Sequence, residues 1–101
     1  MKEKVYACLT RIPKGKVVTY GQIAEMLGNR KLARVVGNHL HRNEDPDRYP
    51  CYKVVNSRGE LSRAYAFGGM EAQARLLRLD GIAVDNGKVD LEKYQYKMPA
   101  D

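Results

Sequence analysis

The sequence of 101 residues predicts a mostly helical domain with a small β component, arranged as a winged-helix-like helix-turn-helix with a C-terminal β-hairpin. Three observations predict this fold. Apolar residues recur at helical spacing near the start of the chain, two short amphipathic stretches follow around a glycine, and alternating residues flank an Asn-Gly pair at residues 86–87. We expect residues 1–94 to form one domain and residues 95–101 a polar tail that frays.

The first helix is predicted from "EKVYACLTRIP", residues 3–13. Val5, Cys8, Leu9 and Ile12 are spaced i, i+3, i+4 and i+7, which places them on one apolar helical face. Pro13 ends the helix because proline lacks the amide hydrogen that a helix needs. Cys8 is therefore predicted to be a buried structural cysteine.

The helix-turn-helix is predicted over residues 17–43. Thr19 and Gln22 have the spacing of a capping box, which indicates a helix that begins directly after Thr19. Gly28 suits the position that follows the last helical residue. A short turn then leads into a second amphipathic helix, residues 30–43. The pattern is typical of a helix-turn-helix, although other small helical hairpins share it.

The second of these helices has two different faces. At 100° per residue, Lys31, Arg34, Asn38 and His41 fall within about 80° of one another. The apolar residues Leu32, Val36 and Leu40 lie on the opposite side. Two cations, an amide and an imidazole suit phosphates and base edges, while an ordinary solvated helix surface is the alternative interpretation.

The rest of the chain alternates loops with short regular elements. We expect a loop at 44–50, a strand and turn at 51–61, a loop of small and aromatic residues at 63–69, a helix at 70–81 and a hairpin at 82–91.

Charge and composition limit the function. The formal net charge is +6, and residues 1–63 carry 13 Lys/Arg against 6 Asp/Glu. This asymmetry favours a polyanionic partner such as nucleic acid, although a solvated basic surface would look the same. No apolar run approaches the roughly 20 residues that span a bilayer, and the first ten residues lack the features of a signal peptide. We therefore expect a cytoplasmic protein with reduced thiols.

Cys51 is the candidate for chemistry, because it lies where a loop meets a predicted strand and follows Pro50. A thiol with the ordinary pKa of about 8.5 is mostly protonated at neutral pH, so a nucleophilic cysteine needs a base or a cation beside it. Strand alternation would direct Lys53 to the same side, whereas Tyr52 is a poor general base. A small buried residue is the alternative. The spacing of histidines and cysteines argues against a metal site.

Several blocks of the sequence resemble one family. "IPKGKVVTYGQIAEMLGNRKLARVVGNHLHRN", "YPCYKVVNSRGEL", "FGG" and "LLRLDGI" occur in the order found in the DNA-binding domain of O6-alkylguanine-DNA alkyltransferases and the alkyltransferase-like proteins. The interval from Asn43 to Cys51 also matches. The resemblance covers roughly residues 3–84, most of the chain.

The resemblance implies a surface that binds DNA and extrudes a base. Tyr20 matches the tyrosine that presses on the target phosphate, and Arg34 matches the arginine finger that replaces the flipped base in the stack. Ala33 and Gly37 suit a helix that lies close to the minor groove. The predicted DNA-binding residues are Tyr20, Lys31, Ala33, Arg34, Gly37, Asn38 and His41.

The same resemblance implies an active-site pocket. Cys51 matches the alkyl acceptor, Asn43 the asparagine that structures the active-site turn, and Asp80 a glutamate that orients the family's histidine. Gly68 and Gly69 match the loop that closes over the flipped base. The predicted catalytic residues are Cys51, Asn43, Tyr52, Lys53 and Asp80. The predicted base pocket comprises Tyr20, Pro50, Cys51, Val54, Phe67, Gly68 and Gly69. No cofactor or metal is implied.

Two functions follow from the way this chain departs from the family. The family's acceptor motif is Pro-Cys-His-Arg, whereas this chain has Pro-Cys-Tyr-Lys. If Cys51 still accepts alkyl groups irreversibly, we expect Lys53 and the pocket's dipoles to lower the pKa of the thiol, with Tyr52 donating a hydrogen bond. The alternative is a non-enzymatic sensor, typical of single-domain alkyltransferase-like proteins, that recruits nucleotide excision repair proteins.

Those sensors usually replace the cysteine with tryptophan or alanine, and this chain keeps it. In both versions the partner is double-stranded DNA containing O6-alkylguanine, and the protein is a monomer that does not bind membranes. A transcriptional regulator is a weaker interpretation, because such proteins usually dimerise to read two half-sites.

Overall fold

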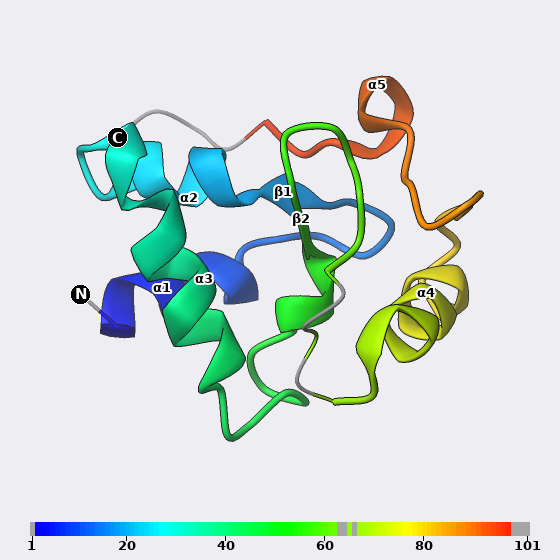
Figure 1. Ribbon diagram of the computed structural model, residues 1–101, viewed down its shortest axis with the longest axis horizontal. Helices are drawn as coiled ribbons and strands as arrows, with labels where there is room; N and C mark the ends of the chain where they lie inside the picture. The colour runs from blue at the N-terminus through cyan, green and yellow to red at the C-terminus, as the bar shows by residue number, and fades with distance from the viewer. Residues whose placement is uncertain (1, 63–64, 66, 98–101) are drawn as a thin grey trace.

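The computed structural model describes residues 2–62, 65 and 67–97, and its N-terminal half is a helical unit (Figure 1). Helix α1 spans Lys2–Thr10, α2 spans Tyr20–Met26 and α3 spans Ala33–His41. A 3₁₀ turn, η1 (Arg30–Leu32), connects α2 to α3. Helix α3 packs against both α1 and α2. The predicted helix-turn-helix is confirmed.

Local capping explains where these helices begin and end. The Thr19 side chain accepts a hydrogen bond from the Gln22 amide at 3.1 Å, and the Gln22 side chain accepts one from the Thr19 amide at 2.8 Å. This reciprocal capping box starts α2, as predicted. Gly28 has a φ of +96°, a conformation that favours glycine, and it turns the chain after α2. The Asn29 side chain then accepts a hydrogen bond from the Lys31 amide and starts η1.

A parallel pair of short strands joins the two halves of the chain. β1 (Val18–Thr19) pairs with β2 (Val54–Val55), with Val18 opposite Val54. Val17, directly before β1, forms an isolated parallel bridge with Gln95 near the C-terminus. The Tyr96 amide donates to the Val17 carbonyl at 2.7 Å. The expectation that the polar tail frays is therefore wrong for Gln95 and Tyr96.

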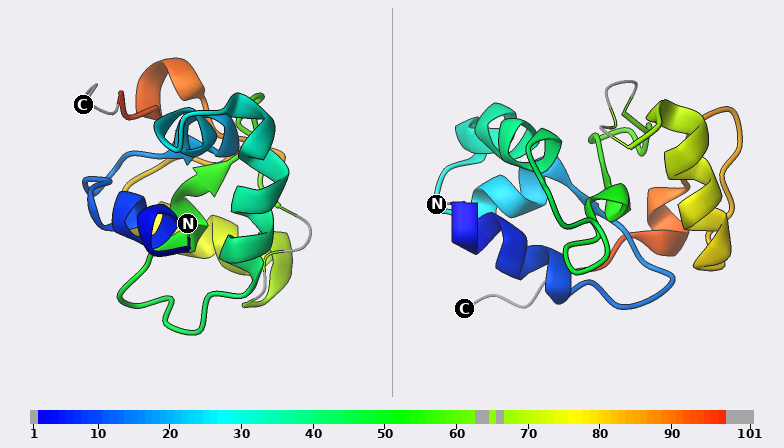
Figure 2. Two further views of the ribbon diagram at one scale, coloured as in Figure 1. Left: turned by 90° about the vertical axis from the view of Figure 1, so that its left-hand side faces the viewer. Right: turned by 90° about the horizontal axis from the view of Figure 1, so that it is seen from below.

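Two apolar clusters meet at this strand pair, since Val18 and Val54 belong to one and Val55 to the other. In the second view of Figure 2, α1, α2 and α3 lie on one side of the strands and α4 (Gly69–Leu79) on the other. The first lies among α1, α2 and α3 and contains Cys8 at the buried position that the sequence predicts. Tyr6 is also buried there, with its hydroxyl donating to the His39 carbonyl. The second cluster lies beneath helix α4. None of the described helices has the length and apolar character needed to cross a membrane.

Cys51 does not begin a strand. Residues Cys51–Lys53 form a 3₁₀ turn, η2, and only Val54–Val55 are extended. The Lys53 amide donates to the Pro50 carbonyl at 3.1 Å, which closes the turn before the chain can enter the sheet. The strand predicted at this point is therefore shorter than expected, and it starts three residues later.

The C-terminal hairpin is present but small. Asn86 and Gly87 both have positive φ angles, 52° and 71°, as a two-residue hairpin turn requires. A single antiparallel bridge between Asp85 and Lys88 closes the turn, and Lys88 also bridges Glu60. The short helix α5, Leu91–Tyr94, follows directly. It is absent from the sequence-based prediction, although Asp90 caps it through its side chain.

Candidate nucleic-acid interface and base pocket

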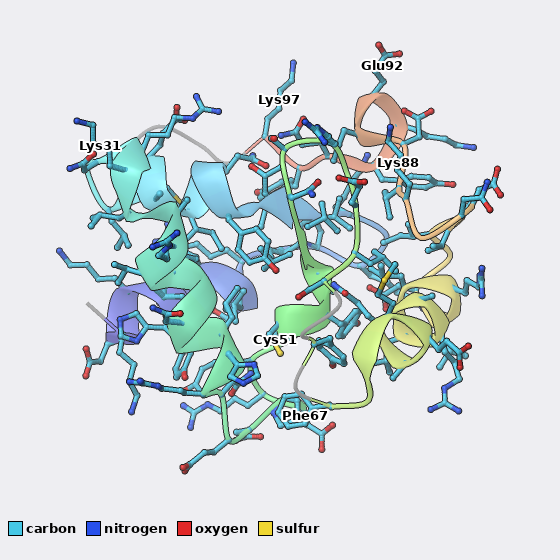
Figure 3. All side chains as sticks on the ribbon, viewed as in Figure 1. Lys31, Cys51, Phe67, Lys88, Glu92 and Lys97 are labelled. Carbon is cyan, nitrogen blue, oxygen red and sulfur yellow. The ribbon has the colours of Figure 1, made fainter. Side chains whose placement is uncertain are left out.

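One face of α3 and of the preceding turn, η1, is polar and exposed to solvent. Lys31, Arg34, Asn38 and His41 are all exposed, whereas Val36 and Leu40 on the opposite side are buried in the first cluster. Lys31 lies at the start of this face, where Figure 3 labels it. The helical spacing in the sequence therefore predicts the polar face of α3 correctly.

Two positions on this side of α3 carry small residues, which leave the helix backbone accessible. Ala33 and Gly37 are half-buried, and a methyl group added at Gly37 would lie 4.0 Å from the Tyr20 ring. Tyr20 begins α2, and burial raises the pKa of its phenol, which the Ser62 hydroxyl opposes by hydrogen bonding. The absence of large side chains at positions 33 and 37 lets a long polymer approach the α3 backbone closely.

A cavity of about 390 Å³ opens beside the C-terminal half of α3. This volume lies within the range of ordinary small-molecule sites. Cys51 lies between α3 and α4 in Figure 3, with Phe67 beyond it. The cavity is lined by Tyr20, Gly37, Asn38, Leu40, His41, Cys51, Ser62, Tyr65 and Gln73.

Two of the seven residues predicted for the base pocket line this cavity. Tyr20 and Cys51 line the cavity, but Pro50, Val54, Phe67, Gly68 and Gly69 are not among its lining residues. Val54 is buried in the first cluster, and Pro50 precedes the 3₁₀ turn. Gly68 and Gly69, with φ angles of 119° and 73°, start α4. Phe67 is 38% exposed outside the cavity.

The Cys51 thiol is buried, with 6% of the residue exposed. Burial raises the pKa of this thiol, while the polar hydrogens of the Asn43 and Tyr65 side chains act in the opposite direction. The expectation of a lowered pKa is therefore wrong. Desolvation is the largest influence, and no cation among the described residues offsets it.

Asn43 organises the loop that leads to Cys51. Its side-chain amide donates to the Tyr49 carbonyl at 2.8 Å and its side-chain oxygen accepts from the Asp45 amide at 3.0 Å. The Cys51 amide donates to the same Tyr49 carbonyl at 2.7 Å. The Tyr49 ring stacks on Tyr6 of α1, with 4.9 Å between ring centroids. Hydrogen bonds of Asn43 thus hold the conformation of this loop, and stacking of Tyr49 on Tyr6 attaches the loop to α1.

Tyr65 is a pocket residue that the sequence did not single out. Its buried hydroxyl lies near the Cys51 thiol but does not reach good hydrogen-bond geometry with any described residue. Burial, followed by the nearby thiol, raises the pKa of this phenol. Its ring packs edge-on against Phe67, 5.6 Å between centroids. A tyrosine inside a loop of small residues was the one available signal.

The Lys53 side chain interacts with the end of α4 and with the segment that follows α1. Its ammonium lies 3.4 Å from a carboxylate oxygen of Asp80 at the end of α4, and it donates to the Ile12 carbonyl at 3.3 Å. The Tyr52 ring lies 5.9 Å from the same ammonium. Burial and the Asp80 carboxylate raise the pKa of Tyr52 to about 12. Tyr52, Lys53 and Asp80 therefore form one cluster. The prediction that Lys53 lowers the pKa of the Cys51 thiol and that Tyr52 donates a hydrogen bond beside it is wrong.

No three His, Cys, Asp or Glu side chains of residues 2–62, 65 and 67–97 come together in a way that would hold a metal ion. Cys8 and Cys51 are both buried, and they form no disulfide with each other.

The fold and the site together define a helix-turn-helix protein with a thiol-lined cavity beside its basic helix. Residues 1–82 match the family described as 6-O-methylguanine DNA methyltransferase, DNA binding domain, and the chain belongs to this family.

Known relatives agree with that assignment. The chain is 45% identical over 92 residues to a bifunctional methyltransferase/endonuclease of Picrophilus torridus, covering 91% of this chain but only 30% of that relative's length. It is 37% identical over 95 residues to a DNA base-flipping protein of Vibrio parahaemolyticus, covering 93% of both chains. Among solved structures, S. pombe Atl1 in complex with damaged DNA containing O6-carboxymethylguanine superposes with a TM-score of 0.86 at 32% identity, covering 96% of this chain and 94% of that one.

Proposed function

We propose that this protein binds double-stranded DNA and rotates an O6-alkylguanine out of the base stack into the cavity beside Cys51. The observation that carries the proposal is the position of the cavity. It opens next to the exposed polar face of α3, and Tyr20 and Cys51 both line it. The name of the Vibrio relative and the modified guanine in the S. pombe complex support the same function.

The physical steps follow from this arrangement. A modified oxygen on guanine is inaccessible inside a duplex, so the nucleotide must leave the stack at a cost of a few kcal/mol. Lys31 and the other exposed cations offset this cost through phosphate contacts, which makes binding salt-dependent. Arg34, exposed on α3, occupies the space that the base leaves. Tyr20 lines the cavity next to Gly37 of α3, where it guides the rotated nucleotide.

The chemistry of the pocket supports recognition as the principal function. The pKa of the Cys51 thiol is raised, and Lys53 is engaged with Asp80 and the Ile12 carbonyl. Tyr65, whose phenol interacts with the thiol, also has a raised pKa and is a poor base at neutral pH. The pocket therefore activates its cysteine weakly, which favours recognition over alkyl transfer.

Alkyl transfer to Cys51 is a second function, favoured by the one observation that this cysteine lines the cavity. The sulfur would attack the alkyl carbon, the carbon–O6 bond would break, and its electron pair would pass to the guanine ring. The thiol proton leaves through water and a proton returns to guanine N1, so the products are a thioether on Cys51 and normal guanine. Since the thiol pKa is raised, this step is slow at neutral pH and accelerates at alkaline pH.

Intact mass measurement separates the two functions. After incubation with a duplex containing O6-methylguanine, recognition alone leaves the mass unchanged while the duplex is bound in preference to an undamaged one. A gain of one methyl group that is absent from Cys51→Ala demonstrates transfer. The recognition proposal is wrong if wild-type protein binds both duplexes equally well.

Arg34→Ala tests the DNA-binding mode. If Arg34 fills the stack, this variant loses the preference for O6-methylguanine, since the flipped state loses its support. A loss that is equal on both duplexes would show that Arg34 contacts phosphate only.

A later repair step must act on a lesion that is bound but not reversed. We propose that this monomeric protein hands the lesion to nucleases of an excision pathway in the cytoplasm. The Picrophilus relative, whose name joins a methyltransferase with an endonuclease, supports this class of partner. In a reconstituted excision reaction, adding the protein should increase incision beside O6-methylguanine. Unchanged incision at saturating protein would contradict the proposal.

A further inference from the structure

Gln73 of α4 is the most deeply buried of the polar side chains that the structure describes, with 1% of the residue exposed. The nitrogen and the oxygen of its side-chain amide both form hydrogen bonds. The side-chain nitrogen donates to the Tyr52 carbonyl at 3.0 Å and to the Val54 carbonyl at 3.1 Å. The side-chain oxygen accepts from the Ser62 amide at 2.9 Å. Gln73 also lines the cavity, so these three bonds lie at the wall of the proposed base pocket.

The bonds of Gln73 join two different segments of the chain at that wall. The carbonyls of Tyr52 and Val54 belong to η2 and β2, the segment that also holds Cys51. Ser62 also lines the cavity, and its side chain interacts with the phenol of Tyr20. One side-chain amide thus connects the segment that carries the cysteine with the residue that contacts Tyr20.

We propose that Gln73 is a positioning residue that fixes the distance between the Cys51 side and the Tyr20 side of the base pocket and thereby sets the preference for O6-alkylguanine. The inference rests on the proposed function. It adds a residue of α4, which lies outside the polar face of α3. Its effect is on selectivity, because the exposed cations proposed to contact DNA, Lys31 of η1 and Arg34 of α3, lie outside α4.

Glutamine meets a requirement that few side chains can meet. Within the described residues β2 pairs with β1 alone, and the Val54 carbonyl accepts from Gln73 of α4 instead of from a further strand. A buried carbonyl needs a donor, and the Ser62 amide needs an acceptor. An amide supplies both at the end of one side chain. Methionine has nearly the same shape and supplies neither, whereas glutamate keeps only the acceptor.

Gln73→Met tests the inference through the ratio of affinities for duplexes with and without O6-methylguanine. We expect this ratio to fall about tenfold, the equivalent of about 1.4 kcal/mol, because the pocket walls lose their fixed separation. Affinity for the undamaged duplex should change by less than about twofold, since α3 carries that binding. The matched control is Leu77→Ala. Leu77 is fully buried in the second cluster on the same helix and does not line the cavity.

The outcomes separate the inference from the proposed function. If wild-type protein shows no preference for the lesion, the proposed function fails and the inference fails with it. If wild type prefers the lesion and Gln73→Met keeps that preference, only the inference is wrong. An equal loss of preference in Leu77→Ala would reduce Gln73 to a general stabilising role and would also overturn it. If Gln73→Met does not fold, Gln73→Glu carries the same test, because it retains the bond to Ser62 and loses only the two donors.

Discussion

The buried ion pair between Lys53 and Asp80 gives the sharpest prediction of stability. Their side chains are 8% and 15% exposed, and 3.4 Å separates the two charged atoms. Lys53→Met leaves the Asp80 carboxylate buried without its cation and removes the donor to the Ile12 carbonyl. Breaking a buried pair in this way costs about 3–5 kcal/mol. A domain of this size has only about 5–15 kcal/mol of stability, so at least about a fifth of it is lost.

The measurement is urea unfolding followed by circular dichroism, together with a thermal melt. At about 4–8 °C per kcal/mol, the melting temperature of Lys53→Met should fall by at least about 12 °C. Removing both charges in Lys53→Met with Asp80→Asn should restore part of the loss, because no unpaired charge remains buried. Lys88→Met is the control, since Lys88 is exposed and its loss should cost less than about 0.5 kcal/mol.

Two results would refute this reasoning. The first is a Lys53→Met variant as stable as the Lys88→Met control. The second is an upward shift in the pH midpoint of Cys51 alkylation by iodoacetamide in Lys53→Met. That shift would mean that the ammonium supports the thiolate after all.

Three further predictions concern DNA binding, the thiol and the start of α4. Lys31→Ala should reduce the slope of log affinity against log salt by about 1 on damaged and undamaged duplexes alike; an unchanged slope would exclude a phosphate contact. Because the Tyr65 side chain partly offsets the raised pKa of Cys51, Tyr65→Phe should raise the pH midpoint of iodoacetamide alkylation further, and a lower midpoint would contradict that role. Gly68→Ala should destabilise the fold by about 1–3 kcal/mol in urea, because φ is +119° and the new methyl group would lie 2.8 Å from the Ala72 Cβ; wild-type stability would show that the backbone adapts.

Local chemistry along the chain determined the helical framework. The capping box of Thr19 and Gln22, the positive φ of Gly28 and the Asn86-Gly87 turn depend on residues a few positions apart, so the sequence alone predicts them. The exposed face of α3 follows from helical spacing in the same way. These features place a basic helix on the surface before any tertiary contact is known.

Tertiary structure alone decided the surroundings of Cys51. The sequence suggested that Lys53 would support the thiol, because alternation along a strand would direct both side chains to the same side. In the fold, Lys53 instead meets a carboxylate 27 positions away at the end of α4. Tyr65 and Gln73 line the cavity because a loop and a helix from the second half of the chain close over it. Long-range packing leaves no periodic trace in a sequence, because it depends on where whole elements dock and not on the spacing within one element.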